Sequence, residues 1–111
     1  METGSDAFCA PFSRAVELIG KRWTGSVLYA VLSGRTRFNE IRRSVPGLSD
    51  RLLSERLKEL EVEGMVVRTV VPSTPVQVTY EATDKGRDLL PIIEALESWA
   101  HRWASARKVA R

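Results

Sequence analysis

The sequence has few of the residues on which catalytic and metal-binding sites are built. Its 111 residues include a single cysteine, Cys9, and a single histidine, His101. An internal disulfide is therefore excluded, and a metal site would have to recruit carboxylates or a second subunit. No spacing of residues resembles a catalytic triad, a phosphate-binding loop or a pair of catalytic carboxylates. We expect neither an enzyme nor a bound metal or cofactor.

Long apolar runs are absent as well, since no stretch reaches the ~18 consecutive apolar residues of a membrane-spanning helix. Residues 1–6 are acidic and polar and lack the basic and apolar regions of a signal peptide. Together with the unpaired cysteine, this predicts a cytoplasmic protein that does not associate with membranes. The chain has no repeat or low-complexity tract. We expect a disordered tail over residues 1–8 and a single domain over residues 9–111.

Acidic residues are scarce in two zones, although the formal net charge is only +3. Between residues 35 and 51 the only acids are Glu40 and Asp50, whereas the bases are Arg35, Arg37, Arg42, Arg43 and Arg51. The tail after His101 has no acid, and its bases are Arg102, Arg107, Lys108 and Arg111. Such zones favour a polyanion, with double-stranded DNA as the candidate partner. A solvated basic surface without a partner is the alternative.

The apolar spacing predicts four helices in the first part of the chain. The first starts at Pro11 and ends at Gly20. The second has Thr24 as its N-cap, ends at Gly34, and buries Val27, Leu28, Val31 and Leu32. A connector or single-bridge strand over residues 35–37 leads to the third helix, which is stopped by Pro46-Gly47 and has Phe38, Ile41 and Val45 on one face. Ser49 caps the fourth, which Gly64 stops.

Two β-branched runs follow, over residues 65–71 and 76–82, and residues 72–75 join them into a hairpin. The period of two predicts that Met65, Val67, Thr69 and Val71 of the first strand share one face of the hairpin with Val76, Val78 and Tyr80 of the second. Arg68 then lies on the opposite face. The loop has no charge, and its Ser73 and Thr74 hydroxyls are suited to phosphate contacts.

A final helix over residues 84–107 is capped by Thr83 and should be bent near Pro91. It has more apolar residues than one small domain can cover, and a large exposed apolar patch marks an interface. We therefore predict that this helix and the first one build a dimer through Phe12, Val16, Leu89, Ile92, Ile93, Leu96, Trp99 and Trp103.

The fourth helix has two distinct faces. Leu48, Leu52, Leu53, Leu57 and Leu60 cluster on one side, and Arg51, Ser54, Glu55 and Lys58 project on the other. Arginine pairs with guanine, and glutamate accepts from cytosine. The residues nearest the N-terminus of a recognition helix reach deepest into the major groove. We expect DNA contacts from this helix and from the neighbouring bases and wing: Arg37, Ser49, Asp50, Arg51, Ser54, Glu55, Lys58, Arg68, Ser73 and Thr74.

The predicted order α-α-α-α-β-β-α defines an α+β fold that is mainly α. It is a winged helix-turn-helix with a two-stranded β-wing and an added C-terminal dimerisation helix. Such a module places a helix in the major groove of DNA and its wing beside it.

Several short motifs in this order resemble the HxlR-type family of bacterial winged-helix transcription regulators. They are Cys9 and Pro11, the segments 18–24, 37–41, 45–49, 53–61 and 64–68, and Pro75, Tyr80, Thr83, Gly86, Leu89 and Trp99. Segment 18–24 is similar to a Gly-Lys-Trp-Thr signature with Arg22 inserted, and Ala82 stands where that family usually has leucine. The resemblance implies a DNA-binding homodimer that is often autoregulatory and acts as a repressor or an activator. It also implies that Arg68 lies near the phosphate backbone; a structural salt bridge is the alternative.

Cys9 is a candidate redox sensor. It precedes Pro11 at the start of the first helix, where the helix dipole favours a thiolate. Some members of the resembled family use a cysteine in this place to sense electrophiles or oxidants. A structural role for Cys9 is the alternative.

These expectations combine into one function. We expect a sequence-specific DNA-binding transcription regulator that acts as a homodimer on a pseudo-palindromic operator and responds to an oxidant or a small-molecule effector. The alternative is a winged-helix protein-interaction module without DNA binding.

Overall fold

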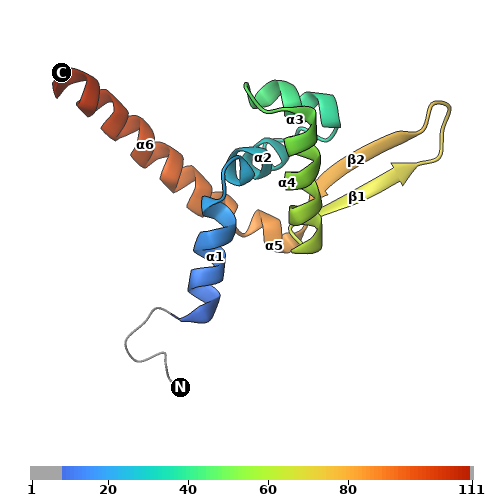
Figure 1. The fold of residues 1–111 in the computed structure, drawn as a ribbon, viewed down its shortest axis with the longest axis horizontal. Coiled ribbons are helices and arrows are strands. Elements are labelled where there is room, and N and C mark those ends of the chain that lie inside the picture. The colour runs from blue at the N-terminus through green and yellow to red at the C-terminus, as the bar shows by residue number, and fades with distance from the viewer. Residues whose placement is uncertain (1–8, 111) are drawn as a thin grey trace.

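The computed structural model describes the backbone of residues 9–110 and the side chains of residues 9–104. The tail expected over residues 1–8 lies outside the described residues. In order, the elements are α1 (Ala10–Gly20), α2 (Thr24–Leu32), α3 (Phe38–Ser44), α4 (Asp50–Val62), β1 (Val66–Val71), β2 (Gln77–Ala82), α5 (Asp84–Arg87) and α6 (Leu90–Ala110). Figure 1 shows α2, α3 and α4 gathered into a body from which the hairpin, α1 and α6 extend. The predicted winged helix-turn-helix is confirmed.

The start of α2 differs from the prediction. Thr24 is the first helical residue, and the N-cap is Trp23, whose φ of 78° places it in the left-handed region. Such a conformation is costly for a bulky side chain, so packing must hold it. The Trp23 ring lies against Gly47 in the α3–α4 turn, where an added Cβ would come within 3.5 Å of the ring. Thr24 is fully buried, and its Oγ1 has no hydrogen-bond partner in the described part of the chain.

The core lies where α2, α3 and α4 meet the base of the hairpin. Its largest fully buried apolar side chains are Leu28, Ile41, Leu53, Leu57, Leu60, Val27 and Val66. Leu32 is only half-buried and packs against this cluster. A Cβ on Gly86 would collide with the carbonyl of Met65, so only glycine lets α5 approach the start of the hairpin this closely.

The hairpin pairs β1 and β2 in an antiparallel register that differs from the prediction. Val66 lies opposite Ala82, Arg68 opposite Tyr80, and Val70 opposite Val78. Residues directly opposite one another share a face, so Val78 and Tyr80 lie with Val66 and Arg68, not with Val67. The core-facing residue is Val66, which is 2% exposed, whereas Val67 is 49% exposed.

The segment over residues 35–37 forms no strand. Its one backbone bond to the hairpin runs from the Tyr80 N–H to the Thr36 carbonyl, at 2.7 Å. This bond attaches the connector between α2 and α3 to the base of the wing.

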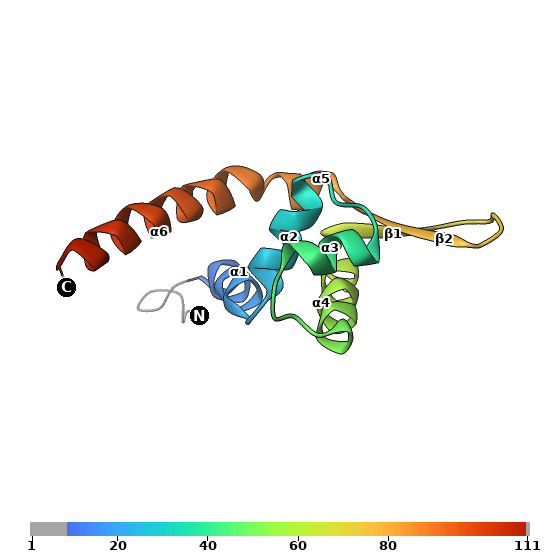
Figure 2. The same cartoon turned by 90° about the horizontal axis from the view of Figure 1, so that it is seen from above.

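The C-terminal helix is broken rather than bent. Thr83 caps α5 as predicted, with its Oγ1 accepting from the Gly86 N–H at 3.1 Å, but α5 ends at Arg87. A new helix, α6, starts at Leu90 with Pro91 in its first turn, where the missing N–H of proline leaves no bond unmade. The break lets α6 leave the body on the side away from the wing, and α1 also extends on that side (Figures 1 and 2).

Candidate nucleic-acid interface

Helix α4 is fixed at both its start and its buried face. Ser49 Oγ accepts from the Leu52 N–H at 3.1 Å, which confirms the predicted N-cap. The predicted leucine face packs inward, with Leu53, Leu57 and Leu60 fully or almost fully buried. The opposite face of α4 is therefore directed to solvent by packing.

Arg56 anchors the same helix to the α1–α2 loop. Its Nε donates to the Arg22 carbonyl at 2.9 Å, and Nη1 lies 3.2 Å from Glu59. Lys21 Nζ donates to Oε2 of the same carboxylate at 2.8 Å and, with Arg56, lowers the pKa of Glu59. Arg56 is therefore engaged within the domain by a backbone carbonyl and an acid, and the charge of Glu59 is balanced by two cations.

The outer face of α4 presents the predicted polar set to solvent. Arg51, Ser54, Glu55 and Lys58 are all exposed. The Arg51 side chain is 89% exposed, and its Nε lies 3.4 Å from Glu55 Oε2. Such a surface pair contributes little to stability, so either group is free to exchange its partner for a base edge or a phosphate.

Asp50, in the first turn of α4, is paired with a residue that sequence reasoning did not assign to the site. Arg42 Nε from α3 lies 3.1 Å from Asp50 Oδ1. This pair links the last turn of α3 to the N-terminus of α4. The structure thus gives Asp50 a positioning partner, while its side chain remains 73% exposed.

Arg37 lies between α3 and the wing. Its Nη2 donates to Gln77 Oε1 on β2 at 3.1 Å. Glu40 Oε1 accepts from the N–H groups of Thr36 and Arg37, at 3.1 and 3.2 Å, and these bonds lower the pKa of Glu40. Neither Gln77 nor Glu40 was predicted as a site residue. The role of Glu40 could have been predicted, because a glutamate in the first turn is a helix-start signal in the segment Arg-Thr-Arg-Phe-Asn-Glu. The bond between Arg37 and Gln77 could not, because it depends on the register of the hairpin.

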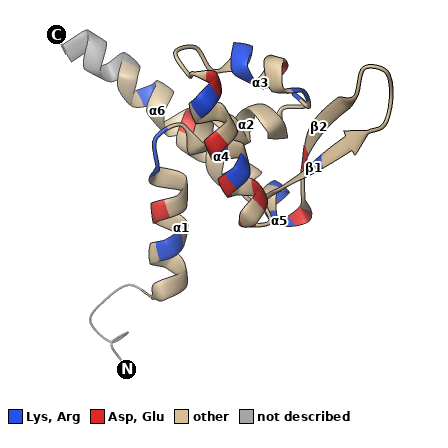
Figure 3. Cartoon of the chain, turned by 45° about the vertical axis from the view of Figure 1, so that its right-hand side comes forward, with Lys and Arg blue, Asp and Glu red and all other residues tan. Residues whose placement is uncertain are grey.

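The wing is largely uncharged beyond its base. Figure 3 shows tan ribbon along most of β1, β2 and their loop, whereas α4 has both signs of charge. Arg68 makes no hydrogen bond or ion pair with any residue that the structure describes. Ser73 is less available than predicted, because its Oγ donates to the Pro75 carbonyl within the loop at 2.7 Å. Thr74 is exposed.

Cys9 is exposed and is the N-cap residue of α1. Its carbonyl accepts from the Ser13 N–H at 3.0 Å, and its side chain makes no cap bond. In residues 9–104 no group of three or more metal-ligating side chains gathers, and no described helix is long and apolar enough to cross a membrane.

The predicted dimer residues divide into two groups. Ile93 is only 7% exposed and belongs to the core of the single chain, and Leu89 is half-buried and packs against that core, so neither presents an open apolar side chain as the others do. The others lie on the outside of α1 and α6: Phe12, Val16, Ile92, Leu96, Trp99 and Trp103. Tyr29 on α2 holds the N-terminal half of α6, because its hydroxyl donates to Glu97 at 2.9 Å, and this bond raises the pKa of Tyr29.

A capped helix with a polar outer face, preceded by a short helix and followed by a β-hairpin, defines a winged helix-turn-helix protein. A family model described as HxlR-like helix-turn-helix matches residues 18–108. The chain belongs to this family of DNA-binding transcription regulators.

Individual relatives agree with this assignment. The chain is 48% identical over 95 residues to an uncharacterised HTH-type transcriptional regulator, YvaP, of Bacillus subtilis, covering 86% of this chain and 88% of YvaP. It is 39% identical over 98 residues to the transcriptional regulator YodB of the same organism, covering 88% of each. The structure is similar to reduced YodB, with a TM-score of 0.75 over 85% of this chain and 92% of that one at 40% identity. It is also similar to the reduced redox regulator HypR, with a TM-score of 0.81 over 90% of this chain and 99% of that one at 34% identity.

Proposed function

We propose that this regulator acts as a homodimer on a pseudo-palindromic operator and reads base sequence through α4. The observation that carries the proposal is the outer face of α4, where four polar side chains stand exposed on a helix whose other side is buried in the core. Its N-terminal turn holds Arg51, the residue type that pairs with guanine through two parallel bonds. Arg37, Lys58 and Arg68 supply cations around it for phosphates.

Homodimerisation is supported by the apolar surfaces of α1 and α6. Both helices extend away from the wing (Figures 1 and 2) and expose large apolar side chains, with Trp99 56% and Phe12 50% exposed. The radius of gyration is 16.6 Å, whereas a compact domain of this length has one of about 13 Å. A second copy that covers α1 and α6 would bury this surface and place two α4 helices on one duplex.

The experiment is selection of binding sites from a random duplex library by the reduced full-length protein. We expect enrichment of an inverted repeat whose half-site centres are about one helical turn, or a multiple of it, apart. Enrichment of a single half-site would contradict the homodimer. Failure to enrich any sequence would favour the alternative, a winged-helix protein-interaction module without DNA binding.

We further propose that Cys9 makes operator binding sensitive to oxidants. Solved structures of YodB include diamide-treated and quinone-bound forms, and HypR has reduced and oxidised forms. Cys9 is exposed at the start of α1, beside the surface assigned to the second subunit. Because the chain has one cysteine, a disulfide would join two subunits or a subunit and a small thiol.

Modification of Cys9 should therefore change operator affinity, whereas Cys9→Ser should bind equally well before and after treatment. The measurement is operator binding by reduced and diamide-treated protein, with modification of the thiol confirmed by mass. Equal affinity of modified and reduced wild-type protein would leave Cys9 with a structural role only.

A further inference from the structure

A hollow of about 450 Å³ lies between α2 and the turn that joins α3 to α4. Trp23 and Tyr29 supply aromatic surface to its lining, and Val45 and Pro46 supply aliphatic surface from the turn. Arg35 and Ser44 supply a cation and a hydroxyl. No carboxylate lines this hollow, and none of the exposed residues on the outer face of α4 contributes to it. It is therefore separate from the DNA-reading surface.

Arg35 is the only charged side chain in this lining. Its Nε donates to Ser44 Oγ at 3.1 Å, which fixes the guanidinium against α3. Its two terminal nitrogens make no hydrogen bond or ion pair with any residue that the structure describes. A guanidinium held at Nε, with its other donors open, is suited to a carboxylate, since the planar fork matches two carboxylate oxygens.

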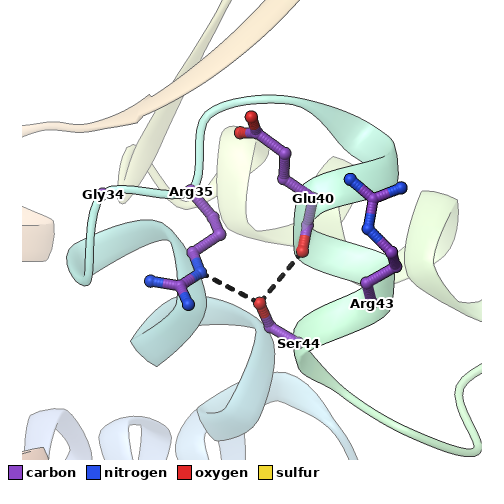
Figure 4. A pocket seen from close by; sticks show the side chains of 5 residues that line it. All are labelled: Gly34, Arg35, Glu40, Arg43 and Ser44. Carbon is purple, nitrogen blue, oxygen red and sulfur yellow. Dashed lines mark hydrogen bonds between the residues drawn. The ribbon is translucent and has the colours of Figure 1, made fainter.

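A neighbouring hollow of about 510 Å³ shares Arg35 and Ser44 but has a different character. Its other charged residues are Glu40 and Arg43, and it has no aromatic side chain. Figure 4 shows that the Arg35 and Arg43 guanidiniums and the Glu40 carboxylate point in three different directions. These side chains do not converge on one ligand atom, and the Arg35 guanidinium points away from Glu40.

Trp23 gives the first hollow its second distinctive feature. This residue is held at a φ of 78°, a conformation that is rare for a bulky side chain and that clusters at functional sites. Its half-buried ring contacts the turn at Gly47, and the Arg22 guanidinium lies 4.9 Å from the ring centroid. An aromatic ring that lines a hollow beside an open guanidinium is complementary to a planar molecule with one anionic end.

We propose that this hollow binds a small aromatic carboxylic acid, with its carboxylate on Arg35 and its ring among Trp23, Tyr29 and Pro46. The occupant would contact the turn that leads into the recognition helix. It would also contact Tyr29, whose hydroxyl donates to Glu97 of α6 at 2.9 Å. The site thus links the DNA-reading helix to α6, and it gives the regulator an effector site that does not involve Cys9.

The test is a titration of the reduced, DNA-free, full-length protein with benzoate, followed through indole and backbone amide signals in NMR spectra. We expect saturable shifts at the Trp23 indole and at the amides of Ser44 and Val45, with a Kd on the order of 1 mM for a ligand of this size. Benzamide, which has the same ring without the charge, should bind about tenfold more weakly or worse. Because no DNA is present, the result is independent of the proposed operator binding.

Arg35→Gln should weaken benzoate binding about tenfold, and Arg35→Lys, which keeps the charge but loses the fork, should lie between it and the wild type. The matched control is Arg43→Gln, which removes the same charge from the neighbouring hollow and should leave the Kd within about twofold. Absence of shifts at about ten times the expected Kd would overturn the proposal. Equal binding of benzoate and benzamide, or equal loss in Arg35→Gln and Arg43→Gln, would overturn it as well.

Discussion

At the scale of single residues, the interface combines groups that are engaged in the fold with groups that are not. The side chains of Asp50, Arg37 and Ser73 each have a partner within the domain, whereas those of Lys58 and Arg68 have no hydrogen-bond or ion-pair partner among the described residues. Arg51 is held only by an exposed pair with Glu55. Side chains without strong partners in the domain break the fewest interactions when they bind DNA. Arg51 and Arg68 are therefore the most informative positions to change.

Arg51→Ala should cost about 1–3 kcal/mol on the selected operator and relax the preference at one base position, because a guanidinium reads a guanine edge in the major groove. Binding to a scrambled duplex should change much less. Arg68→Ala should weaken binding to both duplexes alike and reduce the salt dependence by roughly one ion, as expected for a phosphate contact.

Both variants are measured by salt titration on the operator and on the scrambled duplex. An Arg51→Ala protein that keeps the full base preference would show that α4 does not read base sequence through this residue. If Arg68→Ala left the salt slope unchanged, the base of the wing would not contact the phosphate backbone.

Thr24 has a fully buried hydroxyl with no partner in the described part of the chain. Thr24→Val replaces that hydroxyl with a methyl group of similar size, which removes the cost of a buried unsatisfied polar atom, about 1–3 kcal/mol. We expect the free energy of unfolding to rise. Thr24→Ser is the control, since it keeps the hydroxyl and loses a buried methyl, and it should destabilise by about 1 kcal/mol. Urea denaturation measures both, and a destabilised Thr24→Val protein would indicate that the hydroxyl is bonded in solution.

At the scale of elements, short polar contacts determine how the helices and strands are oriented. The carboxylate of Glu40 closes the N-terminus of α3, Arg42 joins α3 to α4, and Arg56 joins α4 to the α1–α2 loop. Arg37 then links α3 to β2. Since the recognition helix itself is fixed mainly by buried leucines, these polar links set the angles between α4, α3 and the wing rather than the existence of the helices.

The cap of α3 should make stability depend on pH. Two backbone N–H groups, of Thr36 and Arg37, lower the pKa of Glu40 in the folded state. A lowered folded pKa stabilises the protein above the unfolded value, about 4.3, and this contribution is lost as the pH falls through the folded pKa. Glu40→Gln keeps an oxygen acceptor but does not titrate, so its stability should fall less steeply below that pH than the wild type's.

The measurement is urea denaturation between pH 7 and the acid limit of folding, at constant ionic strength. Glu94→Gln, a change at an exposed residue of α6, is the control and should follow the wild type. Parallel curves for Glu40→Gln and the wild type would show that the Glu40 cap does not titrate with a lowered pKa.

At the scale of the whole molecule, the body contains the buried core, whereas α1 and α6 present exposed apolar surface. The body is complete by itself, since its core residues come from α2, α3, α4, the hairpin base and the first turn of α6. Five large apolar side chains on α1 and α6 are more than half exposed: Val16, Ile92, Leu96, Trp99 and Trp103. A monomer would leave these surfaces in water, and this is the physical basis of the proposed dimer.

Leu96→Asp places a charge in the middle of the exposed surface of α6 and should give a folded monomer. The change does not touch the core, because Leu96 is 54% exposed in a single chain. The control is Val76→Asp, at a residue of the hairpin that is 62% exposed. The hairpin extends on the side away from α1 and α6 (Figure 1), so this variant should remain a dimer. Sedimentation velocity distinguishes the two, with circular dichroism to verify folding. A dimeric Leu96→Asp protein would place the interface elsewhere.

The sequence alone determined the first four helices, the hairpin and which face of α4 is buried. Ser49, Gly64 and Thr83 predicted helix ends correctly, because capping depends on neighbours a few residues away. The leucine spacing predicted the exposure of Arg51, Ser54, Glu55 and Lys58, because helix geometry alone separates the two faces.

Only the tertiary structure decided how these elements meet. The strand period was visible in the sequence, but the pairing of Val66 with Ala82, which turns Arg68 toward the Tyr80 face, depends on the antiparallel register of the whole hairpin. The break between α5 and α6 and the burial of Ile93 follow from packing on the core, which overrides a helical pattern that looks continuous. Likewise, the Trp23 conformation and the open guanidinium of Arg35 arise where α2 meets the α3–α4 turn. Contacts between residues distant in the chain have no signature in local spacing, because their energies depend on positions that only the folded chain brings together.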